Sequence, residues 1–117
     1  VAVENPKRSW LWGILTCLVL QTGDSSFIEW FSALKNVDFH ACMHGSLRDK
    51  KTRLLSSCGL YESLAVECDG KHTHKPWHVM QKGRHLEFAT ALEAEYPRLL
   101  CQRMAACLAK AAHEKGV

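Results

Sequence analysis

An acid, an amide and a proline follow a short apolar start, as Val3-Glu4-Asn5-Pro6, and lead into a tryptophan-rich run. This order is typical of a carboxylate presented at the carboxyl end of a buried strand in an α/β protein. Such an acid can protonate or hydrogen-bond a ring nitrogen when burial raises its pKa, and Pro6 would fix its direction. The alternative is structural, because an acid near a helix N-terminus complements the helix dipole. Glu4 is the candidate catalytic residue of this segment.

Thiol and imidazole side chains gather in a second segment, Cys68-Asp69-Gly70-Lys71-His72-Thr73-His74. Zn²⁺ prefers four sulfur or nitrogen ligands in a tetrahedron, and the end of a predicted strand offers two more donors. No Cys-x-x-Cys pair and no finger-like spacing is present, so a polar loop whose histidines cap backbone groups stays open as the alternative. The predicted metal ligands are Cys42, His44, Cys68, His72 and His74.

A third segment is basic and carries Arg48, Lys50, Lys51 and Arg53. Such a run can neutralise phosphates and position a duplex without reading its sequence. A solvated loop between two strands explains the same residues equally well. Trp77 and His78 could stack on a base, although a tryptophan beside a proline more often fills a core.

Length and composition limit the classes of protein. The chain has 117 residues, 47% of them hydrophobic, and a net charge of +3, which favours one globular domain over disorder. The six cysteines are irregularly spaced, so a reducing, intracellular compartment is favoured over a secreted disulfide protein. A nuclear location fits the interpretations that involve DNA. The first residue is Val1, and we expect a piece of a longer protein.

The apolar run from Trp10 to Leu20 needs its own interpretation. Together with Lys7-Arg8 it imitates a signal peptide, but no small-x-small cleavage site follows. It is also shorter than the roughly 20 residues that span a bilayer, so no membrane segment is expected. A buried helix that begins at Ser9 as its N-cap is the preferred prediction.

Periodicity predicts the remaining elements. A strand ends near Val3, and apolar residues from Phe27 to Leu34 recur at helical spacing. We expect strands at 37–43 and 53–57, a helical turn or connector at 60–66, a loop at 69–84, and a capping box at Thr90–Glu93. A last helix begins at Pro97 and ends near Lys115-Gly116, with Leu100, Met104, Cys107 and Ala111 on its apolar face.

Two of these segments resemble motifs of the DNA cytosine-5 methyltransferases. Val3-Glu4-Asn5-Pro6 is similar to the strand-end Glu-Asn-Val motif, with Pro6 in place of Val. The stretch from Cys42 to Arg53 resembles a later strand that is followed by Gln-x-Arg-x-Arg, with Arg48 where Gln is usual. Glu-Asn-Pro, the Trp-rich helix and Cys-Asp-Gly-x-His-x-His together look like uncharacterised mobile-element proteins of algae and fungi, over about positions 1 to 100.

The resemblance implies the C-terminal part of a doubly wound, methyltransferase-type α/β sheet, with a His/Cys-rich loop and a terminal helix. It implies that Glu4 contacts the cytosine, and that Lys50 and Arg53 touch the target nucleotide or its phosphate. S-adenosylmethionine and the nucleophilic cysteine would belong mostly upstream of Val1, so this chain alone would be inactive.

Residues 1–117 are therefore expected to form one partial domain, with a strand-helix-strand core at 1–57, a His/Cys-rich region at 58–89 and a terminal helix at 90–117. The first functional hypothesis is a fragment or degenerate remnant of a cytosine-5 methyltransferase-like protein of mobile-element origin. The alternative is a non-catalytic, zinc-stabilised module that binds nucleic acid. The sequence upstream of Val1 would discriminate between them.

Overall fold

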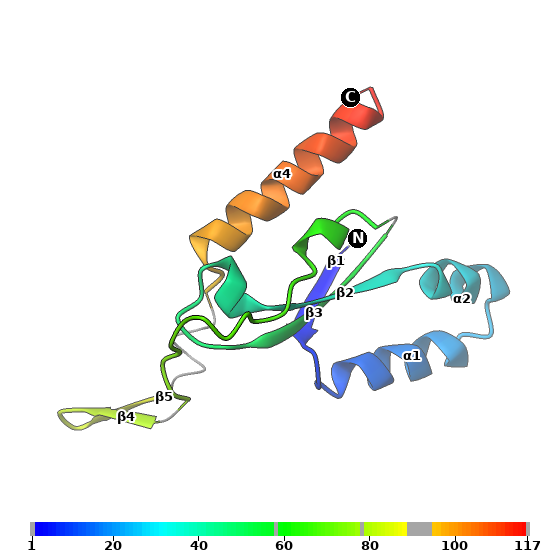
Figure 1. Ribbon diagram of the computed structural model, residues 1–117. Coiled ribbons are helices and arrows are strands. Elements are labelled where there is room, and N and C mark those ends of the chain that lie inside the picture. Colours follow the sequence, from blue (N-terminus) through cyan, green and yellow to red (C-terminus); the bar gives the residue numbers. More distant parts are fainter. Residues whose placement is uncertain (1, 58, 78, 89–94, 117) are drawn as a thin grey trace.

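The computed structural model describes residues 2–57, 59–77, 79–88 and 95–116. The elements are β1 (Ala2–Pro6), α1 (Leu11–Gln21), α2 (Ser25–Ser32), β2 (Lys35–His40), the 3₁₀ helix η1 (Ala41–His44), β3 (Lys51–Ser56), the 3₁₀ helix η2 (Glu62–Leu64), β4 (Val79–Lys82), β5 (His85–Phe88) and α4 (Arg98–Glu114). Figure 1 shows their arrangement.

The main sheet has three strands in the order β1-β3-β2. The central strand β3 is antiparallel to both neighbours, so that Leu54 lies opposite Glu4 on one side and Val37 on the other. The mixed α/β class predicted from the sequence is confirmed. The finer prediction of a doubly wound sheet is not confirmed, because that architecture is built on parallel strands joined by helical crossovers.

One face of this sheet forms the core with η2 and α4. Val37, Phe39 and Leu54 alternate along β2 and β3 and pack against Tyr61, Leu64 and Leu100. Met104 and Cys107 extend the contact along α4, at the i+4 and i+7 positions after Leu100. The predicted helix is confirmed, as is its apolar face at Leu100, Met104 and Cys107, and the helix ends at Glu114 with Lys115 as its C-cap.

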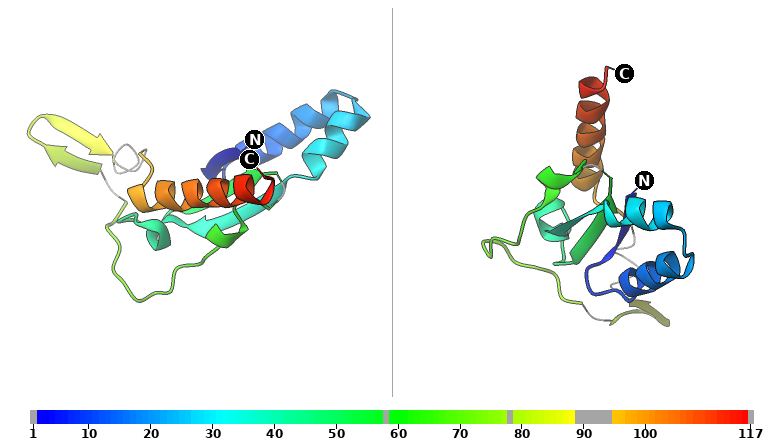
Figure 2. Two further views of the ribbon diagram at one scale, coloured as in Figure 1. Left: turned by 90° about the horizontal axis from the view of Figure 1, so that it is seen from above. Right: turned by 90° about the vertical axis from the view of Figure 1, so that its right-hand side faces the viewer.

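The helices α1 and α2 lie on the other side of the sheet from α4 (Figure 2), where their side chains line a cavity together with Asn36, Arg53 and Leu55 of the sheet. The prediction of a buried helix at 9–20 is wrong in its burial. Trp10, Ile14 and Leu18 are more than half exposed, and Val19 is the buried residue of α1. A three-stranded sheet offers too narrow a face to cover a helix that is apolar all round. Ser9 still accepts a hydrogen bond from the backbone N–H of Leu11, although Trp10 takes the N-cap position.

Two further segments differ from the sequence-based expectation, and a third prediction falls outside the described residues. The basic stretch predicted as a loop to Arg53 ends at Lys50, because β3 begins at Lys51. The loop predicted at 69–84 ends in the hairpin β4–β5, which turns at Gly83 with a φ of +60° and points away from the main sheet in Figures 1 and 2. The capping box predicted at Thr90–Glu93 lies outside the described residues, as does His78, predicted beside Trp77 as a stacking residue.

The molecule is elongated, with principal extents of 54 × 36 × 25 Å and a radius of gyration of 17.1 Å. A compact domain of this length would have a radius of gyration of about 13 Å. The hydrophobic core is therefore small for the length of the chain. Segments outside this core must be held by contacts other than core packing. Within the described part of the chain, none of the helices is long and apolar enough to cross a membrane.

Candidate metal centre

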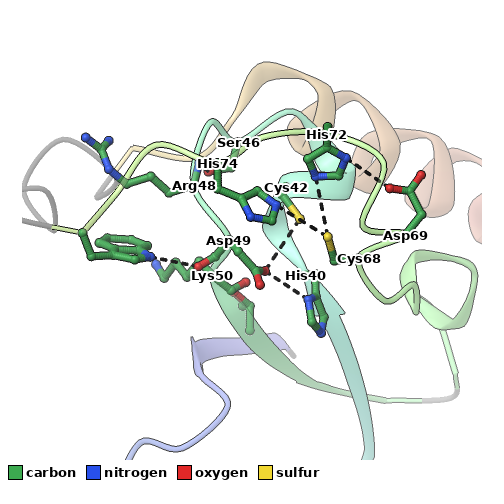
Figure 3. A network of polar contacts seen from close by, with 12 residues as sticks. His40, Cys42, Ser46, Arg48, Asp49, Lys50, Cys68, Asp69, His72 and His74 are labelled. Atoms are coloured by element: carbon green, nitrogen blue, oxygen red, sulfur yellow. Dashed lines mark hydrogen bonds and ion pairs between the residues drawn. The ribbon is translucent and has the colours of Figure 1, made fainter.

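Two chain segments that are far apart in the sequence meet beyond the end of β2 (Figure 3). The first is η1, which carries Cys42 and ends at Gly45 with a φ of +97°. The second begins at Cys68 and turns back at once, because Asp69 Oδ1 accepts a hydrogen bond from the N–H of Lys71 at 2.9 Å and Gly70 has a φ of +69°. This turn directs the next two histidines back toward Cys68.

Four donor atoms converge at this point. The Sγ of Cys68 lies 3.7 Å from Nε2 of His72 and 3.5 Å from Nε2 of His74. The Sγ of Cys42 completes the group, and all four donor atoms lie within 4.8 Å of one another. Two thiols and two imidazoles are a donor set that suits Zn²⁺.

The distances match what a tetrahedral ion requires. With Zn–S bonds of about 2.3 Å and Zn–N bonds of about 2.0–2.1 Å, a sulfur and a nitrogen ligand stand about 3.6 Å apart. The two measured S···N distances, 3.5 and 3.7 Å, lie on either side of this value. The four residues therefore form a candidate metal site in which both separations measured from Cys68 already fit a tetrahedral ion.

A carboxylate orients one of the four ligands. The Nδ1 of His72 lies 3.2 Å from Oδ1 of Asp69, so its Nε2 is the nitrogen that faces Cys68. Metal-binding histidines commonly hold their second nitrogen against a carboxylate in this way, which fixes the ring and raises its basicity. The rings of His72 and His74 pack edge to face at 4.7 Å, which holds them in register.

The pKa of the Cys42 thiol is raised to about 12, first by burial and then by the neighbouring Cys68 and Asp49. The Sγ of Cys42 donates to Oδ1 of Asp49 at 3.6 Å. Acidic groups thus crowd this site. A bound divalent cation would reverse the effect, because a thiol that coordinates a metal loses its proton.

His44, predicted as a fifth ligand, lies outside this group. It is buried, and its Nε2 is 2.9 Å from the carbonyl oxygen of Leu64 while its Nδ1 is 2.8 Å from Nη1 of Arg103. Burial is the largest of the effects that lower its pKa, so the ring is neutral, accepts from Arg103 and donates to Leu64. Its role is to tie η1 to η2 and α4.

The four predicted nucleic-acid-binding cations do not form one exposed run. Arg48 is 4% exposed, donates from Nε to the carbonyl oxygen of Pro76 and lies over the ring of Trp77. Arg53 forms a two-pronged pair with Asp38, with N···O distances of 2.8 and 3.1 Å. The two remaining predicted cations are Lys50 and Lys51.

Of these two lysines, Lys51 is exposed at the start of β3. The Nζ of Lys50 instead lies 4.0 Å from Oε1 of Glu4. Side-chain interactions on the protein itself therefore engage Arg48, Lys50 and Arg53, and Lys51 is the member of the set that points most freely to solvent.

Glu4 lies on the edge strand β1, where its Oε2 accepts a hydrogen bond from the hydroxyl of Tyr96 at 2.9 Å. Burial, followed by this hydrogen bond, raises the pKa of Tyr96 to about 12. The cavity beside the two side chains has a volume of about 20 Å³. That is room for about one water molecule, so this cavity does not hold a base.

Sequence reasoning missed Asp49, Asp69 and His40 as part of the site. Asp69 follows a predicted ligand directly, and an Asx turn before glycine is a recognisable signal for it. Asp49 and His40 carry no such signal, because they approach Cys42 only after β2 and β3 have paired. The antiparallel register places His40 opposite Lys51, and Asp49 is two residues before Lys51.

Comparison with protein-family models, curated proteins and solved structures gives no significant match to this chain.

Proposed function

We propose that this chain is a zinc-stabilised module that binds single-stranded nucleic acid. The observation that carries the proposal is the convergence of Cys42, Cys68, His72 and His74, with S···N distances that suit a tetrahedral zinc ion. Such an ion would tie the segment at 42–49, called here the strand-end loop, to the segment at 68–77, called the His/Cys loop.

Three hydrogen bonds support the same connection. The N–H of Lys75 donates to the carbonyl oxygen of Leu47 at 2.8 Å, and Nε of Arg48 donates to that of Pro76 at 3.1 Å. The indole Nε1 of Trp77 donates to the carbonyl oxygen of Asp49 at 3.0 Å. These bonds hold the end of the His/Cys loop against the strand-end loop, so an ion bound at the cysteines would stabilise both.

The contact between the two loops supports a nucleic-acid-binding surface, because it leaves an aromatic ring and several cations exposed to solvent. Trp77 is 44% exposed although its indole nitrogen is bound to the backbone. Lys71 and Lys75 lie exposed in the same loop, and Lys51 is exposed at the start of β3, two residues after Asp49. A fixed aromatic ring with flanking cations suits a strand whose bases are free to stack.

A single strand is preferred over a duplex. Backbone contacts to duplex DNA depend on several free cations, and three of the four predicted ones are engaged by other groups of this chain. Stacking on an aromatic ring needs fewer cations and contributes about 1–3 kcal/mol per base.

The cytosine-5 methyltransferase interpretation stays a prediction about a longer parent protein. Glu4 would have to release Tyr96 and Lys50 to meet a base. S-adenosylmethionine would have to bind upstream of Val1. The test is methyl transfer by the intact parent with Glu4→Gln, where a loss of about 100-fold is expected for a positioned acid.

The module itself is tested with a fluorescently labelled single-stranded oligonucleotide and zinc-loaded protein, measured by anisotropy. We expect Trp77→Ala to weaken binding by about 10- to 100-fold. Trp77→Phe, which keeps a ring but loses the indole donor, should weaken binding less. Trp10→Ala is the matched control, because Trp10 is 87% exposed at the start of α1. Equal binding by Trp77→Ala and wild-type protein, or no binding by zinc-loaded wild-type protein, would overturn the proposal.

A further inference from the structure

A second group of donor atoms lies beside the first and shares one residue with it. His40, Cys42 and Asp49 place a nitrogen, a sulfur and an oxygen within 4.8 Å of one another. The Oδ1 of Asp49 lies 3.6 Å from Sγ of Cys42 and 3.0 Å from Nδ1 of His40. Figure 3 shows Asp49 between the other two side chains.

The three residues come from positions that the backbone fixes well. His40 is the last residue of β2, and its N–H donates to the carbonyl oxygen of Val66 at 3.0 Å. The next N–H, of Ala41, donates to the carbonyl oxygen of Lys50 at 2.9 Å, which holds the residue after Asp49 against the end of β2. The donor atoms therefore face one another because of strand pairing.

One atom of the group is left without a hydrogen bond. The Nδ1 of His40 is buried and, despite its 3.0 Å distance to Asp49, makes no hydrogen bond of acceptable direction. A buried nitrogen that makes no hydrogen bond destabilises the folded state. Coordination of a cation would use the lone pair of this nitrogen and would not need an N–H directed at the carboxylate.

One of the two distances fits a tetrahedral cation as it stands, and the other, 3.0 Å between Nδ1 of His40 and Oδ1 of Asp49, is a few tenths of an ångström shorter than such an ion sets. A sulfur and an oxygen ligand on a tetrahedral zinc ion stand about 3.6 Å apart, which equals the measured separation of Cys42 and Asp49. A thiolate sulfur has more than one lone pair and can bind two ions at once. Two ions bridged in protein sites lie about 3.5–4 Å apart.

We propose that His40, Cys42 and Asp49 form a second divalent-cation site, which shares the Cys42 thiolate with the first site. This inference rests on the proposed metal site at Cys42, Cys68, His72 and His74. The second site has three protein ligands and so leaves a position for water or an anionic oxygen, as catalytic zinc sites do. It is therefore the weaker and more exchangeable of the two.

The competing arrangement is a single ion with His40 and Asp49 as a hydrogen-bonded pair beside it. The two arrangements differ in stoichiometry and in the ligands of Cys42. Cobalt(II) and cadmium(II) report both, because thiolate-to-cobalt charge transfer and cadmium chemical shifts change when a sulfur bridges two ions.

The experiment is a titration of the reduced chain with cobalt(II), followed by native mass spectrometry and absorption, in a Cys17→Ser, Cys101→Ser background that removes two exposed thiols. We expect two equivalents to bind. In Asp49→Asn and in His40→Gln the second should bind at least about 100-fold more weakly while the first keeps its affinity. His113→Gln, an exposed histidine in the last turn of α4, should still bind two.

Each result has one meaning. One equivalent in the background protein, or two equivalents of unchanged affinity in both Asp49→Asn and His40→Gln, overturns the second site and leaves the first in place. No tight equivalent in the background protein overturns the first site as well. Two equivalents that fall to one in either variant support the second site.

Discussion

Cys68→Ser tests the structural role of the metal most directly. The Sγ of Cys68 is the donor atom that both histidine rings face, at 3.7 and 3.5 Å. A serine hydroxyl is a poor zinc ligand at neutral pH, because zinc prefers a deprotonated, softer donor. The substitution keeps the size and polarity of the side chain, so its main effect should be the loss of the ion.

The size of the effect follows from the loop that the ion closes. Cys42 and Cys68 enclose β3 and η2. A cross-link across a loop of roughly 27 residues removes about 3–4 kcal/mol of conformational entropy from the unfolded chain. The total free energy of unfolding of a domain is only about 5–15 kcal/mol, and this core is small for its chain. The loss should lower the melting temperature by about 10–20 °C.

The assay is thermal unfolding by circular dichroism under reducing conditions, with excess zinc and with a strong chelator. Wild-type protein should melt about 10–20 °C higher with zinc. Cys68→Ser should melt at the lower temperature in both conditions, and Cys101→Ser, which alters an exposed thiol on α4, should respond as wild-type does. A wild-type melting temperature that ignores the chelator, or a zinc response that survives in Cys68→Ser, would refute the reasoning.

Three further outcomes are expected. Leu100→Ala should reduce the free energy of unfolding by about 2–5 kcal/mol, whereas Leu108→Ala, on the exposed side of the same helix, should change it by less than about 0.5 kcal/mol; denaturant titration measures both. The pKa of Asp38 is lowered, chiefly by its arginine partner, so this pair stabilises the fold above pH 4 or so and is lost as pH falls through the lowered pKa. Because the carboxylate is a third exposed, Asp38→Asn should remove at most about 1 kcal/mol at pH 7 and nothing near pH 2. Glu4→Gln should move the pKa of Tyr96 down from about 12 toward its ordinary value, as read by near-ultraviolet absorbance titration; an unchanged pKa would mean that burial alone raises it.

The elements that sequence alone predicted are those with a local signal. Pro97 pre-sets the first turn of α4, and apolar residues at helical spacing then place one face on the core. The strand around Val37 and Phe39 also follows from alternation. In both cases the information lies within a few residues of the element itself.

The failures have a common physical origin. The run at 9–20 is apolar enough to be buried, yet a sheet of three strands covers only part of it, and the number of strands is not a local property. The hairpin around Gly83 was hidden because its strands are only four residues long, and polar residues interrupt them. Strand direction was also not predicted. Antiparallel pairing on both sides of β3 depends on the path of the chain between the strands, which no local sequence pattern specifies.

The residues of the candidate site also fall into those that a local sequence signal predicts and those that it does not. Cys68, His72 and His74 were predictable because Asp69 and Gly70 make a turn that brings them together within seven residues. Cys42 was predictable as a donor near a strand end, but its neighbours were not.

The structure places His40, and not the predicted His44, beside Asp49, and the local backbone explains this difference. The two histidines lie on either side of Cys42, and their types and spacing give no preference between them. The 3₁₀ turn at 41–44 directs His44 into the core, where Arg103 and the carbonyl oxygen of Leu64 bind both ring nitrogens. His40, at the end of β2, is left facing Asp49 with a buried ring nitrogen that makes no hydrogen bond. One turn of backbone therefore decides which histidine faces Cys42 and Asp49, and the proposed second cation site depends on that turn.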